Sequence, residues 1–169
     1  MKNIFILIFL ISIFNGYSQE KNQSEEILKG VCISGNCNMG FGVMKWDDGT
    51  IYIGDWWNEI PSGQGTVIWS DGSVYSGEFK AGMYSGNGTL ITSQNLYVGE
   101  FSEDFPEGHG TMLMTSGMYV GDFFNGNMHG KGFMINKQGV LEEATWEDNI
   151  PIGDTLMIRE NYILRKVNK

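Results

Sequence analysis

The sequence has few of the residues that carry metal, redox or acid–base chemistry. Its 169 residues include two cysteines, two histidines and three prolines. His109 and His129 stand far along the chain from Cys32 and Cys37, so the four do not form the closely spaced cluster of a metal site. No signature of an activated nucleophile with its base is present either. The sequence therefore predicts a protein that is not an enzyme, with no catalytic residue, no cofactor and no bound metal.

Positive charge is also scarce, because 11 lysines and arginines face 20 aspartates and glutamates, a net charge of -9. Between Cys32 and Gly153, 15 acidic residues stand against four lysines. An acidic surface repels the phosphates of nucleic acids and anionic lipid headgroups. Nucleic acid is therefore not expected as a partner. The last eleven residues reverse this balance, and their basic members are Arg159, Arg165, Lys166 and Lys169.

Long apolar runs are absent apart from one at the N-terminus, Ile4–Phe14. Its 11 residues fall short of the ~20 that a spanning helix needs, and small residues follow it. This is the pattern of a signal peptide over residues 1–18, cleaved near Ser18, with an uncleaved anchor as the alternative. The mature chain is then exported to the periplasm, the cell envelope or the medium. Residues 19–31 are polar and unpatterned, which indicates a linker.

In an exported chain, Cys32 and Cys37 predict one disulfide that closes a small loop. A disulfide needs Cα atoms within about 7 Å, and a turn at Gly35-Asn36 can bring them that close. Two free thiols are the alternative.

Glycine and aromatic residues, in contrast, are abundant and recur at fixed spacing. The segment Tyr52-Ile53-Gly54-Asp55-Trp56 returns three more times, at intervals of 23, 22 and 22 residues. A Gly-x-Gly pair begins seven residues after each Trp or Phe, and a turn position closes each unit, at Gly72, Asn95, Gly117 and Gly139. The four full copies of this signature comprise Tyr52, Gly54, Trp56, Gly63 and Gly65; Tyr75, Gly77, Phe79, Gly86 and Gly88; Tyr97, Gly99, Phe101, Gly108 and Gly110; and Tyr119, Gly121, Phe123, Gly130 and Gly132.

Imperfect copies flank the four full ones, as expected of a stacked array whose ends need caps. The array divides into a partial unit at 32–51, full units at 52–74, 75–96, 97–118 and 119–141, and a degenerate unit at 142–153. Residues 154–169 form a C-terminal cap or tail, either as a last hairpin or as a short helix.

This repeat resembles the MORN (membrane occupation and recognition nexus) repeat, and the resemblance covers roughly Cys32 to Gly153. It implies an all-β fold, an elongated single antiparallel sheet of stacked β-hairpins. The residues themselves point the same way, because Tyr, Gly and Trp or Phe at alternate positions share one face of a strand. The glycine leaves a slot that a neighbouring strand or an aromatic ring of the next unit can close. An isolated hairpin is marginal in water, whereas stacked neighbours bury the aromatic row.

The acidic residue of the signature projects from the opposite face of the strand, at Asp55, Glu78, Glu100 and Asp122. Rungs of this ladder lie ~10 Å apart, beyond the ~8 Å Debye length, so they act as separate charges. The ladder is either a surface for cations and basic partners or a structural part of the repeat that binds nearby backbone. His109 and His129 fall at positions that vary between units, which predicts solvent-facing turns.

These features favour a non-catalytic, exported scaffold that presents an extended sheet surface to another exported or envelope protein. The predicted contact points are bulky residues outside the repeat slots, Trp57, Tyr84, Phe105 and Phe124. The alternative is association with lipid or glycan of the cell envelope, through the basic tail or the aromatic rows. No oligomeric state is predicted.

Overall fold

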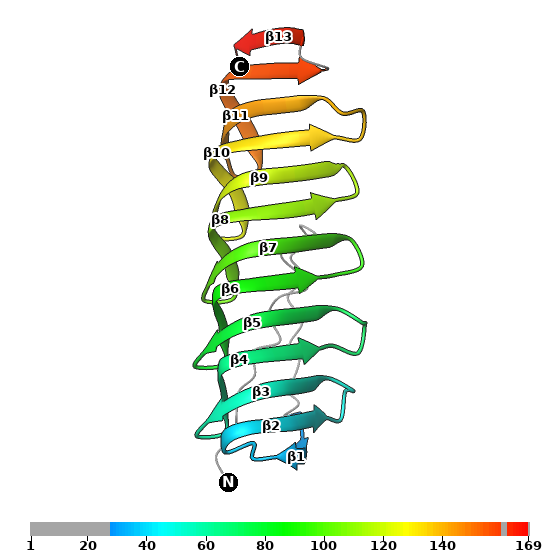
Figure 1. Cartoon of the computed structure of the whole chain (residues 1–169), viewed down its shortest axis with the longest axis vertical. Helices are drawn as coiled ribbons and strands as arrows, with labels where there is room; N and C mark the ends of the chain where they lie inside the picture. Colours follow the sequence, from blue (N-terminus) through cyan, green and yellow to red (C-terminus); the bar gives the residue numbers. More distant parts are fainter. Residues whose placement is uncertain (1–27, 160–161, 169) are drawn as a thin grey trace, which may run out of the picture.

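The computed structural model describes residues 28–159 and 162–168, with side chains as far as residue 158. The predicted signal peptide and most of the predicted linker lie outside the described residues. The described chain forms one sheet of 13 antiparallel strands in sequence order, which confirms the predicted fold class (Figure 1). The strands are β1 (Gly30–Gly35), β2 (Met39–Trp46), β3 (Ile51–Trp57), β4 (Ile60–Ile68), β5 (Val74–Lys80), β6 (Met83–Ile91), β7 (Asn95–Ser102), β8 (Phe105–Met114), β9 (Gly117–Phe124), β10 (Asn127–Asn136), β11 (Leu141–Glu147), β12 (Ile150–Arg159) and β13 (Tyr162–Asn168). In this part of the chain, no helix is long and apolar enough to cross a membrane.

The strands bend along one edge of the sheet, where they turn toward the back of the molecule in Figure 1. In each unit the pairing register shifts beside the middle glycine of the signature, for example between Gly54 and Trp56. The returning strand carries the extra residues, including Gly63 at φ 77°. Such bulges bend a strand, and a positive φ suits glycine. The signature glycines therefore place a bend at the same position in every unit.

The aromatic core is a zigzag of rings on the inner side of this bend. Tyr52, Tyr75, Tyr97 and Tyr119 are at most 2% exposed. Each tyrosine ring meets the Trp or Phe of its own unit and that of the next unit edge-to-face, at centroid distances between 4.9 and 5.3 Å. Edge-to-face pairs contribute about 0.5–1.5 kcal/mol each beyond their buried area. These eight contacts therefore join neighbouring units into one continuous core.

The tyrosine of the signature, and not a ring of the next unit, closes the glycine slot. The Tyr75 hydroxyl donates a hydrogen bond to the carbonyl of Glu78 at 3.0 Å, which draws the ring across its own strand. A Cβ at Gly77 or at Gly88 would lie 2.6 Å from that hydroxyl oxygen. The neighbouring strand also closes the slot, as one of the two predictions had it, since a Cβ at Gly77 would lie 2.6 Å from the Cα of Gly88. The alternative of a ring from the next unit was wrong, because the tyrosine hydroxyl finds its partner three residues along its own strand.

The two ends of the array differ from its middle. At the first edge, Cys32 and Cys37 form the predicted disulfide, with Cα atoms 5.9 Å apart and Gly35 in a turn at φ 73°. At the far edge, β12 and β13 pair as a hairpin, which decides against the helical alternative. In the degenerate unit, Ala144 and Thr155 replace signature glycines and are buried. No tyrosine ring crosses the strand there, so the larger side chains have room.

Candidate binding face

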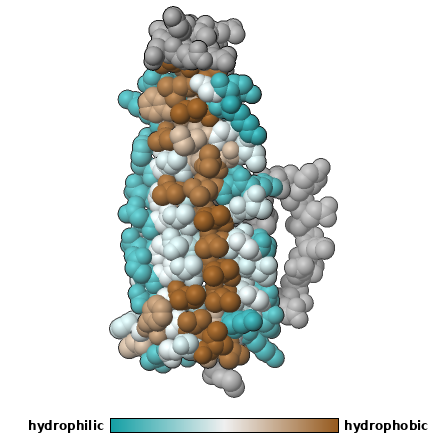
Figure 2. Space-filling view, turned by 45° about the vertical axis from the view of Figure 1, so that its right-hand side comes forward, coloured by the Kyte–Doolittle hydropathy of each residue, from teal (hydrophilic) through white to brown (hydrophobic). Residues whose placement is uncertain are grey.

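The face of the sheet opposite the aromatic core, here called the outer face, carries a continuous row of aliphatic side chains. Every strand from β3 to β12 contributes one residue, and each residue pairs directly with its neighbours in the register of the sheet. This aliphatic row consists of Ile51, Ile68, Val74, Ile91, Leu96, Leu113, Met118, Ile135, Leu141 and Ile158. Figure 2 shows hydrophobic side chains gathered in such a stripe along the length of the molecule.

The aliphatic row is open to solvent. None of its ten members is buried, and Ile91, Leu113 and Ile135 are 43%, 51% and 37% exposed. Because strand residues alternate between faces, each member lies next to a core residue in sequence but on the other side of the sheet. Contiguous exposed apolar side chains of this kind are often found at interaction sites.

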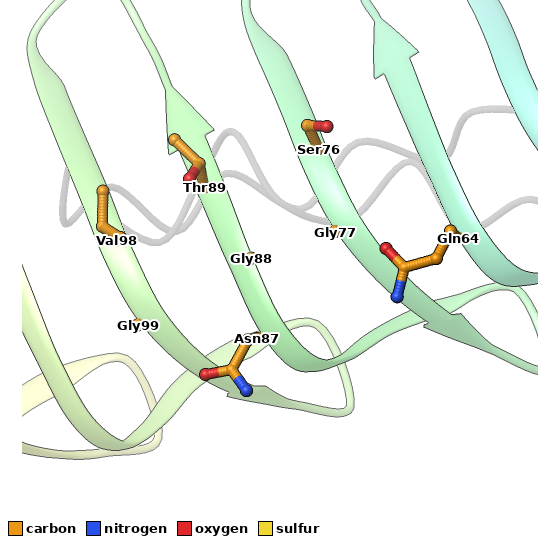
Figure 3. A pocket seen from close by; sticks show the side chains of 8 residues that line it. All are labelled: Gln64, Ser76, Gly77, Asn87, Gly88, Thr89, Val98 and Gly99. Atoms are coloured by element: carbon orange, nitrogen blue, oxygen red, sulfur yellow. The ribbon is translucent and has the colours of Figure 1, made fainter.

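The row that borders the aliphatic row on the outer face mixes small hydroxyl side chains with apolar ones. The hydroxyl side chains include Thr66 and Ser76, whose hydroxyl oxygens are 2.9 Å apart, and Thr89. The apolar side chains include Val98 and Phe133, which are 47% and 43% exposed. A shallow depression of about 360 Å³ lies beside the hydroxyl side chains, seen from close by in Figure 3. Its lining is Gln64, Ser76, Gly77, Asn87, Gly88, Thr89, Val98 and Gly99. The depression separates the small hydroxyl side chains from a polar row nearer the bend.

That polar row contains the predicted carboxylate ladder. Each carboxylate accepts a hydrogen bond from the backbone N–H nine residues further on, at 3.1 to 3.3 Å. The pairs are Asp55 with Gln64, Glu78 with Asn87, Glu100 with His109, and Asp122 with Lys131. These N–H groups belong to the residues that the register shift inserts into the returning strand. The ladder therefore has the structural role that was one of its two predicted roles.

The two histidines lie in strands, not in the turns that were predicted for them. Both belong to the bulged part of a returning strand, next to a positive-φ glycine, which explains why their positions vary between units. His109 is exposed and its Nδ1 lies 3.0 Å from Asp122 Oδ1. His129 is half-buried, with its ring 5.6 Å from that of Phe124. Among the described residues, no group of three or more acidic, histidine or cysteine side chains is placed to hold a metal ion.

The predicted contact residues divide into three environments. Trp57 and Phe124 are 60% and 50% exposed, as a contact role requires. Phe105 is half-buried beside the tip of the next hairpin, near Gly126. Tyr84 was wrongly placed on the surface, since it is 6% exposed and its ring stacks on that of Tyr75 at 3.7 Å. The contact role of Trp57, Phe105 and Phe124 remains a prediction.

Tyr84 is buried because the array alternates between two kinds of unit. All three prolines of the chain, Pro61, Pro106 and Pro151, occupy one inner position in alternate units, 45 residues apart. Tyr84 and Met128 occupy that position in the intervening units, where their backbone N–H groups donate to Asp104 and Asn149. Burial raises the pKa of Asp104, although the hydrogen bond from Tyr84 opposes this shift. The proline spacing is the sequence signal that would have predicted a buried Tyr84.

The family model of the MORN repeat matches residues 39–51, 52–74, 75–94, 97–118 and 119–139. These five matches cover more than half of the chain. The chain belongs to the MORN repeat family. No curated protein matches it. The aliphatic row of this MORN array occupies the residue before each signature tyrosine and the third residue after each Gly-x-Gly pair, a pattern that alignment of the units would have revealed.

We expect the carboxylates of the MORN units to stabilise the bulges as hydrogen-bond acceptors and not through their charge. Glu100→Ala leaves the N–H of His109 without its 3.1 Å acceptor and should lower the free energy of unfolding by about 1 kcal/mol. Glu100→Gln keeps an acceptor oxygen and should stay close to the parent chain. Urea unfolding of the three proteins measures both changes. An equal loss in the two variants would mean that charge, not the hydrogen bond, matters at this position.

Proposed function

We propose that this chain is an exported, non-catalytic scaffold that presents the outer face of its sheet to another exported protein. Membership of the MORN repeat family indicates a repeat-type binding protein, and all-β folds of this family are typically non-catalytic. The observation that carries the proposal is the aliphatic row, ten uncharged side chains in register and open to solvent.

The length of the row suits a scaffold. Ten strands spaced ~4.8 Å apart extend the row over roughly 43 Å, longer than a small-molecule site. A partner bound along the whole row would contact every central unit of the array, so each unit would contribute part of the binding energy. Exposed Trp57 and Phe124 lie beyond the bend and offer a second set of contacts.

Export is supported by two independent features. The N-terminal sequence has the pattern of a signal peptide, and the Cys32–Cys37 disulfide is compatible with an oxidising compartment. Association with envelope lipid or glycan is less well supported, because the aromatic rings of the repeat are buried in the core and are not free to stack on sugars.

Cross-linking in the native cell, followed by purification of a tagged chain, tests the proposal. Two double variants of matched chemistry are compared with the parent, Ile91→Thr with Leu113→Thr in the row and Trp57→Thr with Phe124→Thr beyond the bend. We expect one exported protein in near-equal amount with the parent chain, and its loss with the row variant. Recovery of lipid or glycan without protein would refute the scaffold function and favour envelope association.

A further inference from the structure

The shape of the aliphatic row limits what can cover it. The row is one side chain wide where Thr66, Ser76 and Thr89 border it, and two side chains wide where apolar residues such as Val98 and Phe133 adjoin it. Even at a full width of about 13 Å, its area is on the order of 500–600 Å² over its length. A standard interface buries about 800 Å² on each partner, which is clearly more. A second copy would also bring another chain of net charge -9 against this acidic face. The row is too narrow for a second sheet, but it matches the 10–12 Å diameter of a single α-helix.

The spacing along the row also fits a helix. Neighbouring members lie one strand apart, ~4.8 Å, whereas apolar side chains on one helix face recur once per turn, ~5.4 Å. A helix of about 28 residues would span the whole row. Its anchors would lie against the most exposed members, Ile91, Leu113 and Ile135.

The carboxylate ladder runs parallel to the aliphatic row and adds a preference for charge. Each carboxylate stands four residues from the row along its strand, for example Asp55 from Ile51, a lateral distance of roughly 13 Å. The side chains between them are uncharged and of small or moderate size, Ile53, Ser76, Val98 and Val120, so a long lysine or arginine can extend across them. Successive rungs are ~9.6 Å apart, close to the ~10.5 Å between helix residues seven positions apart.

After accepting the backbone N–H groups of the bulges, the carboxylates can still accept hydrogen bonds from a partner protein. In Asp55, Glu78 and Glu100, one oxygen accepts the backbone N–H, and the other has no hydrogen-bond partner within the described part of the chain. Lys131 and His109 are the basic side chains within this row, and His109 lies against Asp122. The polar row thus offers a line of accessible hydrogen-bond acceptors beside the aliphatic row.

We infer that the outer face binds an amphipathic α-helix of another protein, with its apolar side on the aliphatic row and lysines or arginines of one flank on the carboxylate ladder. This inference rests on the proposed scaffold function and specifies the chemistry of the partner.

The probe is a synthetic helix of about 28 residues, with leucines on one face and a lysine at every seventh position of one flank. Its binding to the purified exported chain is followed by fluorescence anisotropy at several salt concentrations. We expect binding about tenfold weaker with Ile91→Thr and Leu113→Thr, since two apolar contacts are lost. Binding should be unchanged with Ile60→Thr and Ile150→Thr, because these exposed residues pair at the opposite ends of their strands from the row. Glu78→Gln with Glu100→Gln keeps both bulge acceptors and should weaken binding several-fold and flatten its dependence on salt.

Two control peptides sharpen the result, one with glutamate for lysine and one with the leucines redistributed around the helix. Equal binding of either control, or undiminished binding to the row variant, would overturn the inference. A dimer of the parent chain that the row variant abolishes, seen by sedimentation, would also overturn it, because a second copy would then cover the row. If the peptide fails but the row variant still loses its partner in the cell, the scaffold function stands and only the helical partner is wrong.

Discussion

Gly77→Ala is expected to lower the free energy of unfolding by about 3 kcal/mol, the upper end of the cost of overpacking a core. A Cβ at this position would lie 2.6 Å from the Cα of Gly88 on the paired strand and 2.6 Å from the Tyr75 hydroxyl oxygen. Neither neighbour can move away without the loss of hydrogen bonds. Gly88 belongs to the backbone of a paired strand, and the buried Tyr75 ring is held by its hydrogen bond to Glu78. Urea unfolding followed by tryptophan fluorescence measures the change.

Two further variants test this explanation of the Gly77 effect. Gly72→Ala adds the same methyl group in an open turn at φ 85°, with no atom within 4 Å, and should cost only about 1 kcal/mol for the backbone conformation. In a Tyr75→Ala background, Gly77→Ala should cost less than in the parent, as the buried Ala144 of the degenerate unit suggests. An undiminished cost in that background would show that the ring is not what excludes the methyl group.

The sequence was sufficient to predict the sheet, the repeat and the disulfide because each depends on residues that are near one another along the chain. Tyr52, Gly54 and Trp56 share a face through the alternation of a strand, whatever the neighbouring strand does. Cys32 and Cys37 are separated by five positions and a glycine turn. His109 faces solvent as predicted, but the prediction that His109 and His129 lie in turns failed. Bulges insert residues into the returning strand, and sequence spacing alone does not locate them.

The candidate binding face was not predicted. Alignment of the units shows the recurring aliphatic positions, but only the register between strands joins them into one row. Ile51 and Ile68 are 17 residues apart, and Ile68 and Val74 are six apart, yet all three are neighbours in one row. A shift of register by one residue would place these side chains on the core face. The bulges fix that register, so the outer face depends on the same glycines and carboxylates that form the bends.

Alkaline pH is expected to unfold the array cooperatively, through its buried tyrosines. Burial, followed by the charge of the neighbouring Asp122, raises the pKa of Tyr119 to about 12. Burial also raises the pKa of Tyr52, Tyr75, Tyr84 and Tyr97 well above the ordinary value, with nearby carboxylates adding to the shift. The unfolded chain ionises its tyrosines near pH 10, so the folded state holds more protons above that pH.

Folding stability falls as the pH rises above about 10, because the folded state holds more protons than the unfolded chain there. A raised tyrosine pKa leaves stability intact below about pH 10 and removes it as the pH rises further, by up to about 1.4 kcal/mol per pH unit for each tyrosine. Five such residues remove up to about 7 kcal/mol per pH unit, so a domain of ordinary stability, about 5–15 kcal/mol, unfolds between about pH 11 and pH 12.

Tyrosinate absorbance and far-UV circular dichroism, recorded together through this range, should change in one steep and coincident step. Tyr119→Phe keeps the ring and removes one titrating group, so it should make the transition shallower by about a fifth. It also loses the hydrogen bond from Tyr119 to the Asp122 carbonyl, which should move the transition to lower pH. Gradual ionisation near pH 10 with the sheet intact would contradict the prediction, because rings that ionise in the folded state cannot be the closed core that joins one unit to the next.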